Sequence, residues 1–239
     1  HIILKNLVTQ GYKGKVYPVN PKRKEILSLP CYPCVSKIPD KIDLAIIAVP
    51  AKVVPDVLKD CAKAGVKGIV VITAGFKEVG KEGYLLEKEI TQIVKESGMK
   101  MVGPNCLGVI NTKSNMNATF APDLPPTGRA ALFSQSGALG VALIDWAIEN
   151  NFGFSKFVSL GNKADLNETD FLEYFAQDPD TDIILGYIED IVDGKRFLEV
   201  ATRVAKIKPI ILIKSGSTEA GARAASSHTG ALAGSDRAF

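Results

Sequence analysis

The sequence predicts an α/β fold with two doubly wound parallel-sheet domains, because short apolar runs alternate with amphipathic stretches along the chain. The apolar runs are rich in Ile and Val, which is typical of strands buried on both faces of a parallel sheet. A stretch of Asn, Pro and Gly at 111–128 interrupts the alternation once and indicates a linker. We therefore expect one domain over residues 1–120 and a second over residues 121–239.

The first half has the pattern of strand, helix and strand expected of a parallel sheet. The predicted strands are 15–19, 44–49, 69–73 and 100–102. The predicted helices are 52–64 and 82–97. Gly65 and Gly98 follow these helices, where a C-terminal glycine is common. Residues 1–7 have the pattern of a helix already under way, so we expect this domain to lack its beginning.

The second half repeats the alternation. The predicted strands are 130–133, 157–159, 183–188 and 210–213. The predicted helices are 137–150, 167–176 and 194–206. A further helix is predicted from Thr229 to the last residue, so we expect this domain to be cut short at its end.

The composition excludes several classes of function. A net charge of +3 is too small to indicate a nucleic acid or a membrane surface as the partner. No apolar run has the length of a membrane span and no signal peptide is recognised, so we expect a cytoplasmic protein. Cys31 and Cys34 have the spacing of half a zinc site or of a redox pair. No second pair follows and the segment is rich in Pro, so we expect free thiols and no metal site.

Four turns of the first domain follow predicted strands, at the sheet edge where open α/β sheets bind ligands. The candidate ligand residues are Asn20, Pro21, Lys22, Val49, Pro50, Thr73, Ala74, Gly75, Asn105 and Cys106. On this pattern alone a nucleotide crevice and four ordinary turns are equally acceptable. The segment Gly75–Glu82 has the glycine and lysine spacing of a P-loop, but Glu82 replaces the hydroxyl that binds magnesium, so we do not predict one.

Ser134, Gln135, Ser136 and Gly137 stand between a predicted strand and the helix that follows it. Helix N-termini present unpaired N–H groups and a favourable dipole to an anion. A plain serine N-cap is the alternative. Two hydroxyls beside a glycine favour a phosphate site.

His228 is the only internal histidine, and it lies among small residues. An exposed imidazole is a good nucleophile near neutral pH and can carry a phosphoryl group. Glu189 ends the predicted strand 183–188, at the same sheet edge as the serine loop. A carboxylate beside an imidazole stabilises its cationic form. A surface histidine and a solvated acid are the alternatives.

These residues resemble the α subunit, or α-like half, of the NDP-forming acyl-CoA synthetases. That family includes the ADP-forming acetate–CoA ligases and relatives of succinyl-CoA synthetase. The segments that carry the resemblance are 73–76, 103–106, 134–137, 159–165 and 227–231.

The resemblance implies a Rossmann-like CoA-binding domain followed by a flavodoxin-like ligase domain. It implies that His228 is phosphorylated, that Glu189 is its carboxylate partner, and that coenzyme A is a substrate bound by the first domain. Gly161 and Asn162 join the serine loop as residues implied to bind phosphate. The family's first strand and glycine-rich loop would lie before His1.

The resemblance also implies the reaction, in which acyl-CoA, a nucleoside diphosphate and phosphate are interconverted with acid, CoA and a nucleoside triphosphate. The intermediates are an acyl phosphate and a phosphohistidine. The nucleotide and its magnesium belong to an ATP-grasp subunit or domain, within an oligomer. Two alternatives stay open: a non-catalytic CoA-binding regulatory module, as in a protein acyltransferase, and an NAD-binding Rossmann protein.

Overall fold

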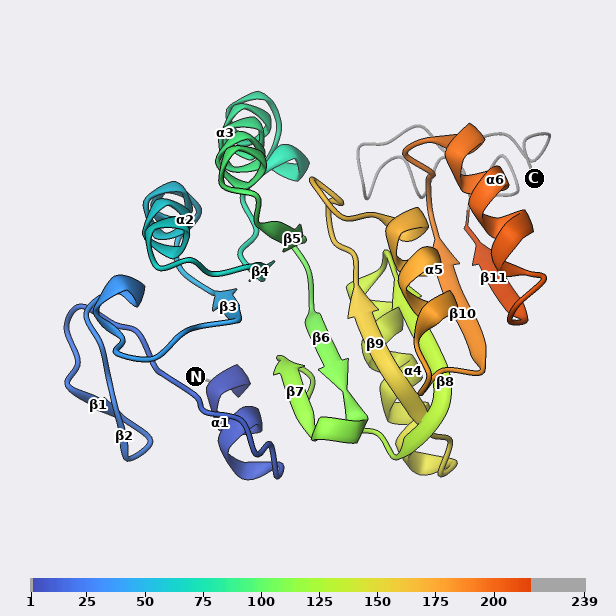
Figure 1. Cartoon of the computed structure of the whole chain (residues 1–239), viewed down its shortest axis with the longest axis horizontal. Helices are drawn as coiled ribbons and strands as arrows, with labels where there is room; N and C mark the ends of the chain where they lie inside the picture. Colours follow the sequence, from blue (N-terminus) through green and yellow to red (C-terminus); the bar gives the residue numbers. More distant parts are fainter. Residues whose placement is uncertain (1, 216–239) are drawn as a thin grey trace.

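The computed structural model describes residues 2–215 and confirms the predicted α/β class (Figure 1). The helices are α1 (Ile2–Thr9), α2 (Val54–Lys63), α3 (Lys81–Ser97), α4 (Gly137–Glu149), α5 (Glu168–Gln177) and α6 (Gly194–Val204). The strands are β1 (Glu25–Ile26), β2 (Leu29–Pro30), β3 (Leu44–Ile47), β4 (Gly68–Val71), β5 (Lys100–Val102), β6 (Gly108–Asn111), β7 (Met116–Thr119), β8 (Thr127–Ser134), β9 (Phe154–Ser159), β10 (Ile183–Ile188) and β11 (Ile210–Lys214). The helices of this region do not include one long and apolar enough to cross a membrane.

The first sheet is parallel, with the order β3-β4-β5, and α2 and α3 lie side by side near it (Figure 1). Successive residues of β4 face opposite sides, because side chains alternate along a strand. Ile69 and Val71 are buried with residues of α2 and α3, whereas Val70 is buried with residues of the second sheet. The core is therefore continuous between the two sheets.

The second sheet has the order β11-β10-β8-β9-β6-β7. Its four strands from β8 to β11 are parallel, and β6 and β7 add an antiparallel edge. Phe133 of β8 is buried with residues of α5 and α6, while its neighbour Leu132 is buried with residues of α4. Helices thus cover both faces of this sheet, as a doubly wound fold requires (Figure 1).

Two predicted elements differ from the structure. Residues 15–19 form no strand: only Val19 makes an isolated bridge, to Tyr32. A strand needs a hydrogen-bonded neighbour, and within residues 2–215 β3 pairs on one side only, with β4. The linker predicted at 111–128 is also wrong in part, because Met116–Thr119 is strand β7.

Strand β7 is held by a polar side chain that is distant in the sequence and that no local pattern indicates. Asn6 of α1 donates to the backbone oxygens of Thr119 and Ala121, at 3.0 and 2.8 Å, and so fixes the end of β7. The pairing of β7 with β6 places both strands in the second sheet, before residue 120. The domain boundary at residue 120 itself stays a prediction.

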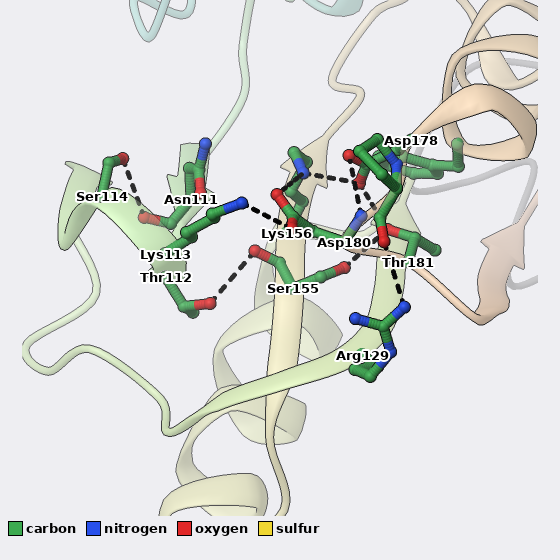
Figure 2. Close-up of polar contacts among 12 residues, drawn as sticks. Asn111, Thr112, Lys113, Ser114, Arg129, Ser155, Lys156, Asp178, Asp180 and Thr181 are labelled. Atoms are coloured by element: carbon green, nitrogen blue, oxygen red, sulfur yellow. Dashed lines mark hydrogen bonds and ion pairs between the residues drawn. The ribbon is translucent and has the colours of Figure 1, made fainter.

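A buried polar cluster lies at the amino ends of the parallel strands (Figure 2). Lys156 of β9 forms an ion pair of 2.5 Å with Asp178, and both residues are buried. Thr181 donates to Asp178 at 2.6 Å and shares a hydrogen bond of 2.8 Å with Ser155. We call these four residues the amino-edge cluster. It joins β9 to the segment before β10, at the end of the sheet opposite the candidate site.

Candidate functional site

The register of the second sheet brings the predicted site residues to one edge. Ser134 pairs with Ser159 on one side and with Tyr187 on the other. Ile188 pairs with Lys214, the last residue of β11. The residues that follow these strands are therefore neighbours, at strand spacings of about 5 Å. They include Gln135 and Glu189.

The serine loop is shaped by its own side chains. Ser136 is the N-cap of α4, and its hydroxyl accepts a hydrogen bond from the Leu139 N–H at 3.3 Å. Ser134 is buried, and its hydroxyl donates to the backbone oxygen of Ser136 at 2.7 Å. Ser136 is half-buried and Gly137 opens the helix, so these two lie where an anion can approach the first turn. Phosphate binding here stays a prediction.

Gln135 joins the serine loop to Glu189. Its side-chain oxygen accepts hydrogen bonds from the backbone N–H groups of Glu189, at 2.9 Å, and Asp190, at 3.2 Å. Its side-chain nitrogen donates to the Asp190 carboxylate. The backbone N–H of Gln135 donates to the backbone oxygen of Tyr187 at 3.0 Å. The Gln135 side chain therefore binds the turn that carries Glu189.

Lys163, which lies after β9, holds the same turn. Its ammonium donates to the Asp190 carboxylate at 2.8 Å and to the Asp190 backbone oxygen at 2.9 Å. It also forms an ion pair of 3.1 Å with the buried carboxylate of Glu168. Burial raises the pKa of Asp190, but the charge of Lys163 and the hydrogen bonds from Lys163 and Gln135 outweigh it, so this pKa lies below the usual value. Asp190 is therefore a carboxylate at neutral pH.

Asn162 is buried, and its side chain contacts residues of the first domain. Its side-chain nitrogen donates to the carboxylates of Glu78, at 2.6 Å, and Glu87, at 2.7 Å. Its side-chain oxygen accepts from Asn105 at 3.2 Å, and Lys77 donates to its backbone oxygen at 2.5 Å. The structure thus places Asn162 in an interdomain polar cluster, and its contact with phosphate stays a prediction.

Gly161 allows this close approach. Its φ is +58°, and a Cβ at this position would lie 2.2 Å from the backbone oxygen of Pro104. Asn162 then donates its own N–H to that oxygen at 2.8 Å. A side chain at position 161 would separate the loop from the first domain, so the glycine has a packing role here.

Three of the four predicted CoA-binding turns meet at one edge of the first sheet. The Thr73 hydroxyl donates to the Val49 backbone oxygen at 2.7 Å, and the Asn105 N–H donates to the Thr73 backbone oxygen at 2.9 Å. Pro50 and Ala74 are exposed beside them, and Gly75 is half-buried. Two hydrogen bonds thus join these three turns, and the binding of CoA by them stays a prediction.

The fourth turn, Asn20–Lys22, is bound elsewhere. Asn20 donates its N–H to the Tyr32 backbone oxygen at 2.8 Å and accepts from the Lys22 N–H at 2.9 Å. Pro21 and Lys22 are exposed. These bonds join the turn to the segment around Tyr32 and not to the other three turns.

Cys106 is buried, and its thiol donates to the Val71 backbone oxygen at 3.3 Å. Burial raises the pKa of this thiol to about 12. Its sulfur therefore contributes to packing, and any contact with CoA in this region must come from its neighbours.

In the segment that has P-loop spacing, an acidic side chain binds the backbone N–H groups of the loop. The Glu78 carboxylate accepts from the N–H groups of Gly75, at 2.6 Å, and Phe76, at 3.1 Å. Burial raises the pKa of Glu78, but the Asn162 amide and these two N–H groups outweigh it, so this pKa lies below the usual value. A carboxylate thus occupies the donors that a P-loop turns toward phosphate.

His228 lies outside the described residues. β11 ends at Lys214, and Ser215, which follows it, donates its N–H to the Ile188 backbone oxygen at 2.9 Å. The chain thus leaves the sheet next to the turn that carries Glu189. No group of three or more His, Cys, Asp or Glu within residues 2–215 has the geometry of a metal site.

Sequence reasoning missed Lys163, Glu168 and Asp190. Lys163 lies within the segment 159–165 that carries the family resemblance, and Asp190 directly follows Glu189. Both positions were therefore visible, but their pairing depends on the sheet order and not on a local spacing.

Two family models cover most of the chain. Residues 1–112 match a "CoA binding domain", and residues 127–239 match a "Succinyl-CoA ligase like flavodoxin domain". The fold and the match thus define a CoA-binding domain followed by a flavodoxin-like ligase domain.

Comparison with individual proteins defines the family within this class. The chain is 55% identical over 237 residues to acetate–CoA ligase (ADP-forming) I of Archaeoglobus fulgidus, covering 99% of this chain and 34% of that protein. It is 49% identical to acetate–CoA ligase (ADP-forming) I subunit alpha of Pyrococcus furiosus, covering 100% of this chain and 53% of that subunit. The structure matches the dinucleotide-forming acetyl-coenzyme A synthetase 1 of Ca. Korarchaeum cryptofilum, in complex with phosphate and ADP. That match has a TM-score of 0.95 and 50% identity, and covers 100% of this chain and 52% of the other.

The chain belongs to the family of the α subunits and α-like halves of the ADP-forming acyl-CoA synthetases. It spans between one third and about half of the length of these relatives.

Proposed function

We propose that this chain is the α component of an ADP-forming acyl-CoA synthetase. It interconverts acyl-CoA, a nucleoside diphosphate and phosphate with acid, CoA and a nucleoside triphosphate. The observation that carries the proposal is the convergence of the α4 start, Glu189 and the end of β11 at one sheet edge. The chain runs on from that edge to its single internal histidine, His228.

The reaction has three steps. A phosphate oxygen attacks the acyl carbon of the thioester, the C–S bond breaks, and CoA leaves as a thiolate. A ring nitrogen of His228 then attacks the phosphorus of the acyl phosphate, and the carboxylate leaves. A terminal oxygen of the nucleoside diphosphate finally attacks the same phosphorus, and the P–N bond breaks.

Each step has a group in this chain that suits it. The N-terminus of α4, with the Ser136 hydroxyl, suits the charge of phosphate and of the phosphohistidine. The Glu189 carboxylate stabilises the positive ring that forms as His228 is phosphorylated. The three joined turns of the first domain suit the binding of CoA.

The proposal places the nucleotide and its magnesium on an ATP-grasp partner, either a separate subunit or a further domain. The chain covers 53% of a relative named "subunit alpha" and 34% of a longer relative, which supports both arrangements. We also propose an oligomer in the cytoplasm.

Phosphoryl transfer tests this proposal. The complete enzyme is incubated with magnesium and ATP labelled at the γ-phosphate, and the labelled protein is then treated with acid. We expect an acid-labile label on the peptide that contains His228, because phosphohistidine is acid-labile whereas phosphoserine is not. An unlabelled protein that still binds CoA would favour a non-catalytic CoA-binding module.

A further inference from the structure

The turn after β10 is held by side chains of other elements. Its N–H groups at Glu189 and Asp190 donate to Gln135, and its N–H at Val192 donates to the Glu168 carboxylate at 3.0 Å. The Asp190 backbone oxygen accepts from Lys163. Four backbone groups of one short turn are therefore fixed by three side chains, from the ends of β8 and β9 and from the start of α5.

These side chains also bind one another. The Asp190 carboxylate accepts from both Gln135 and Lys163, and Lys163 also pairs with Glu168. The side chains of Lys163 and Glu168 are 2% and 0% exposed. Salt screens this buried ion pair only weakly. A substitution of Lys163 therefore removes hydrogen bonds that hold the turn itself.

Lys163 adopts a left-handed backbone conformation, which is disfavoured for a residue with a Cβ. Its φ is +56°, a region that glycine and asparagine adopt more easily. From this position its ammonium forms ion pairs with both Asp190 and Glu168. Such strained residues cluster at functional sites, where other contacts hold them in place.

We propose that Lys163 and Asp190 are positioning residues that hold the Glu189 carboxylate at the distance from the serine loop that phosphoryl transfer to His228 requires. The network links the Glu189 turn to Gln135, one residue before the N-cap of α4. It thus joins the two groups to which we assign the stabilisation of the phosphohistidine. This inference rests on the proposed function.

A purely structural role makes a different prediction, and the amino-edge cluster allows the comparison (Figure 2). Lys156 is also a buried lysine paired with a carboxylate, and it lies on β9, shortly before Lys163. It lies at the opposite end of the strands from Glu189. Lys156→Met is therefore a matched control for Lys163→Met, since each removes a buried positive charge from its carboxylate partners.

The test uses the complete enzyme and compares both variants at a temperature at which both are folded. We expect both substitutions to lower the melting temperature. We expect phosphorylation of His228 by labelled ATP to slow by about 10- to 100-fold in Lys163→Met, because misplacement by about 1 Å at a reacting centre costs up to 100-fold in rate. In Lys156→Met the rate should stay within about twofold of the wild-type rate, because sites that are far apart and share no partners are nearly independent.

A milder variant guards against misfolding. In Gln135→Glu a carboxylate faces Asp190, and at lower pH a proton shared between the two acids supplies an O–H donor in place of the lost N–H donor. The rate of this variant relative to wild type should therefore rise as the pH falls, whereas loss of a merely structural contact gives a ratio independent of pH.

Hydrogen exchange of residues 187–193 supplies a readout besides activity. Faster exchange of these residues in Lys163→Met than in Lys156→Met would support the role of Lys163 in holding the turn. Equal exchange in the two variants, or equal phosphorylation rates, would overturn the positioning role. The wild-type enzyme could form no phosphohistidine while Lys163→Met still exchanges faster at the turn. The proposed function would then fail, but Lys163 would still hold the turn in place.

Discussion

Gln135 and Glu189 are joined by a hydrogen bond of 2.9 Å, in which the Glu189 backbone N–H donates to the Gln135 side-chain oxygen. The two residues lie 54 positions apart and follow adjacent strands, β8 and β10. This bond couples the start of α4, the predicted phosphate site, to the acid predicted to stabilise the phosphorylated imidazole. The site is therefore one connected unit and not a set of independent side chains.

The first prediction concerns Ser136. Replacing it with alanine removes the N-cap of α4 and a hydroxyl donor to phosphate. Loss of the cap should cost about 1 kcal/mol of stability. Loss of a hydrogen bond to a charged group is worth about 1.5–3 kcal/mol, so the KM for phosphate should rise about tenfold or more. Steady-state kinetics with varied phosphate measure this. A variant that is less stable but has an unchanged KM for phosphate would reduce Ser136 to a plain cap.

The second prediction concerns the contact between the domains. Asn162→Leu keeps the size of the side chain but leaves the Glu78 and Glu87 carboxylates without its N–H groups. The free energy of unfolding should fall by about 2–4 kcal/mol, because the buried Glu87 carboxyl loses a hydrogen-bond donor that leucine cannot replace. Denaturant unfolding measures it. Asn150→Leu is the control, since Asn150 is exposed and its side chain donates to the Trp146 backbone oxygen, in the helix that it follows. Equal losses in the two variants would contradict the interdomain role.

The third prediction concerns the thiols. Burial raises the pKa of both Cys61 and Cys106 to about 12, so at pH 8 only about one in 10⁴ of these groups is a thiolate. Cys31 and Cys34 are half-buried and free. Iodoacetamide should therefore modify these two at least about a hundredfold faster than the buried pair in the native protein. Peptide mapping by mass spectrometry reports the rates, and equal rates without denaturant would show that the first domain is not packed as described.

The fourth prediction concerns acid stability. Burial raises the pKa of Asp178, but hydrogen bonds from Lys156 and Thr181 and the charge of Lys156 outweigh it, so this pKa is lowered in the folded protein. A lowered folded pKa gives stability that is present above the unfolded pKa of about 3.9 and lost as the pH falls through the lower, folded value. The free energy of unfolding should thus decrease below about pH 4. In Asp178→Asn that part of the decrease should be absent, and an unchanged pH profile would show that Asp178 does not drive it.

The sequence predicted the elements that have strong local patterns. The strand at 183–188 was predicted with the bounds that β10 has, because its apolar run is continuous and flanked by polar residues. The residues 15–19 contain a lysine and a proline beside their apolar residues and form only a bridge, because Pro18 has no N–H to donate and a strand also requires a neighbour. A local sequence pattern indicates where a strand tends to form, and pairing with a neighbouring strand decides whether it forms.

The candidate site shows the same limit. Ser136 and Glu189 could be predicted because each follows a recognisable strand. Lys163 and Asp190 could not, because their pairing depends on the order β10-β8-β9, which brings the ends of non-adjacent segments together. Asn162 was predicted to bind phosphate from the resemblance alone, and its carboxylate partners become visible only once the two sheets are packed.

The central claim is that His228 carries the phosphoryl group with Glu189 as its partner. The most direct measurement is the acid-labile label left by γ-labelled ATP on the complete enzyme, compared among wild type, His228→Ala and Glu189→Gln. We expect no label on this chain in His228→Ala, because its only other histidine is His1. In Glu189→Gln we expect labelling slower by about 100-fold or more, since removing one preorganised electrostatic partner costs about that much. An acid-labile label retained by this chain in His228→Ala would contradict the account.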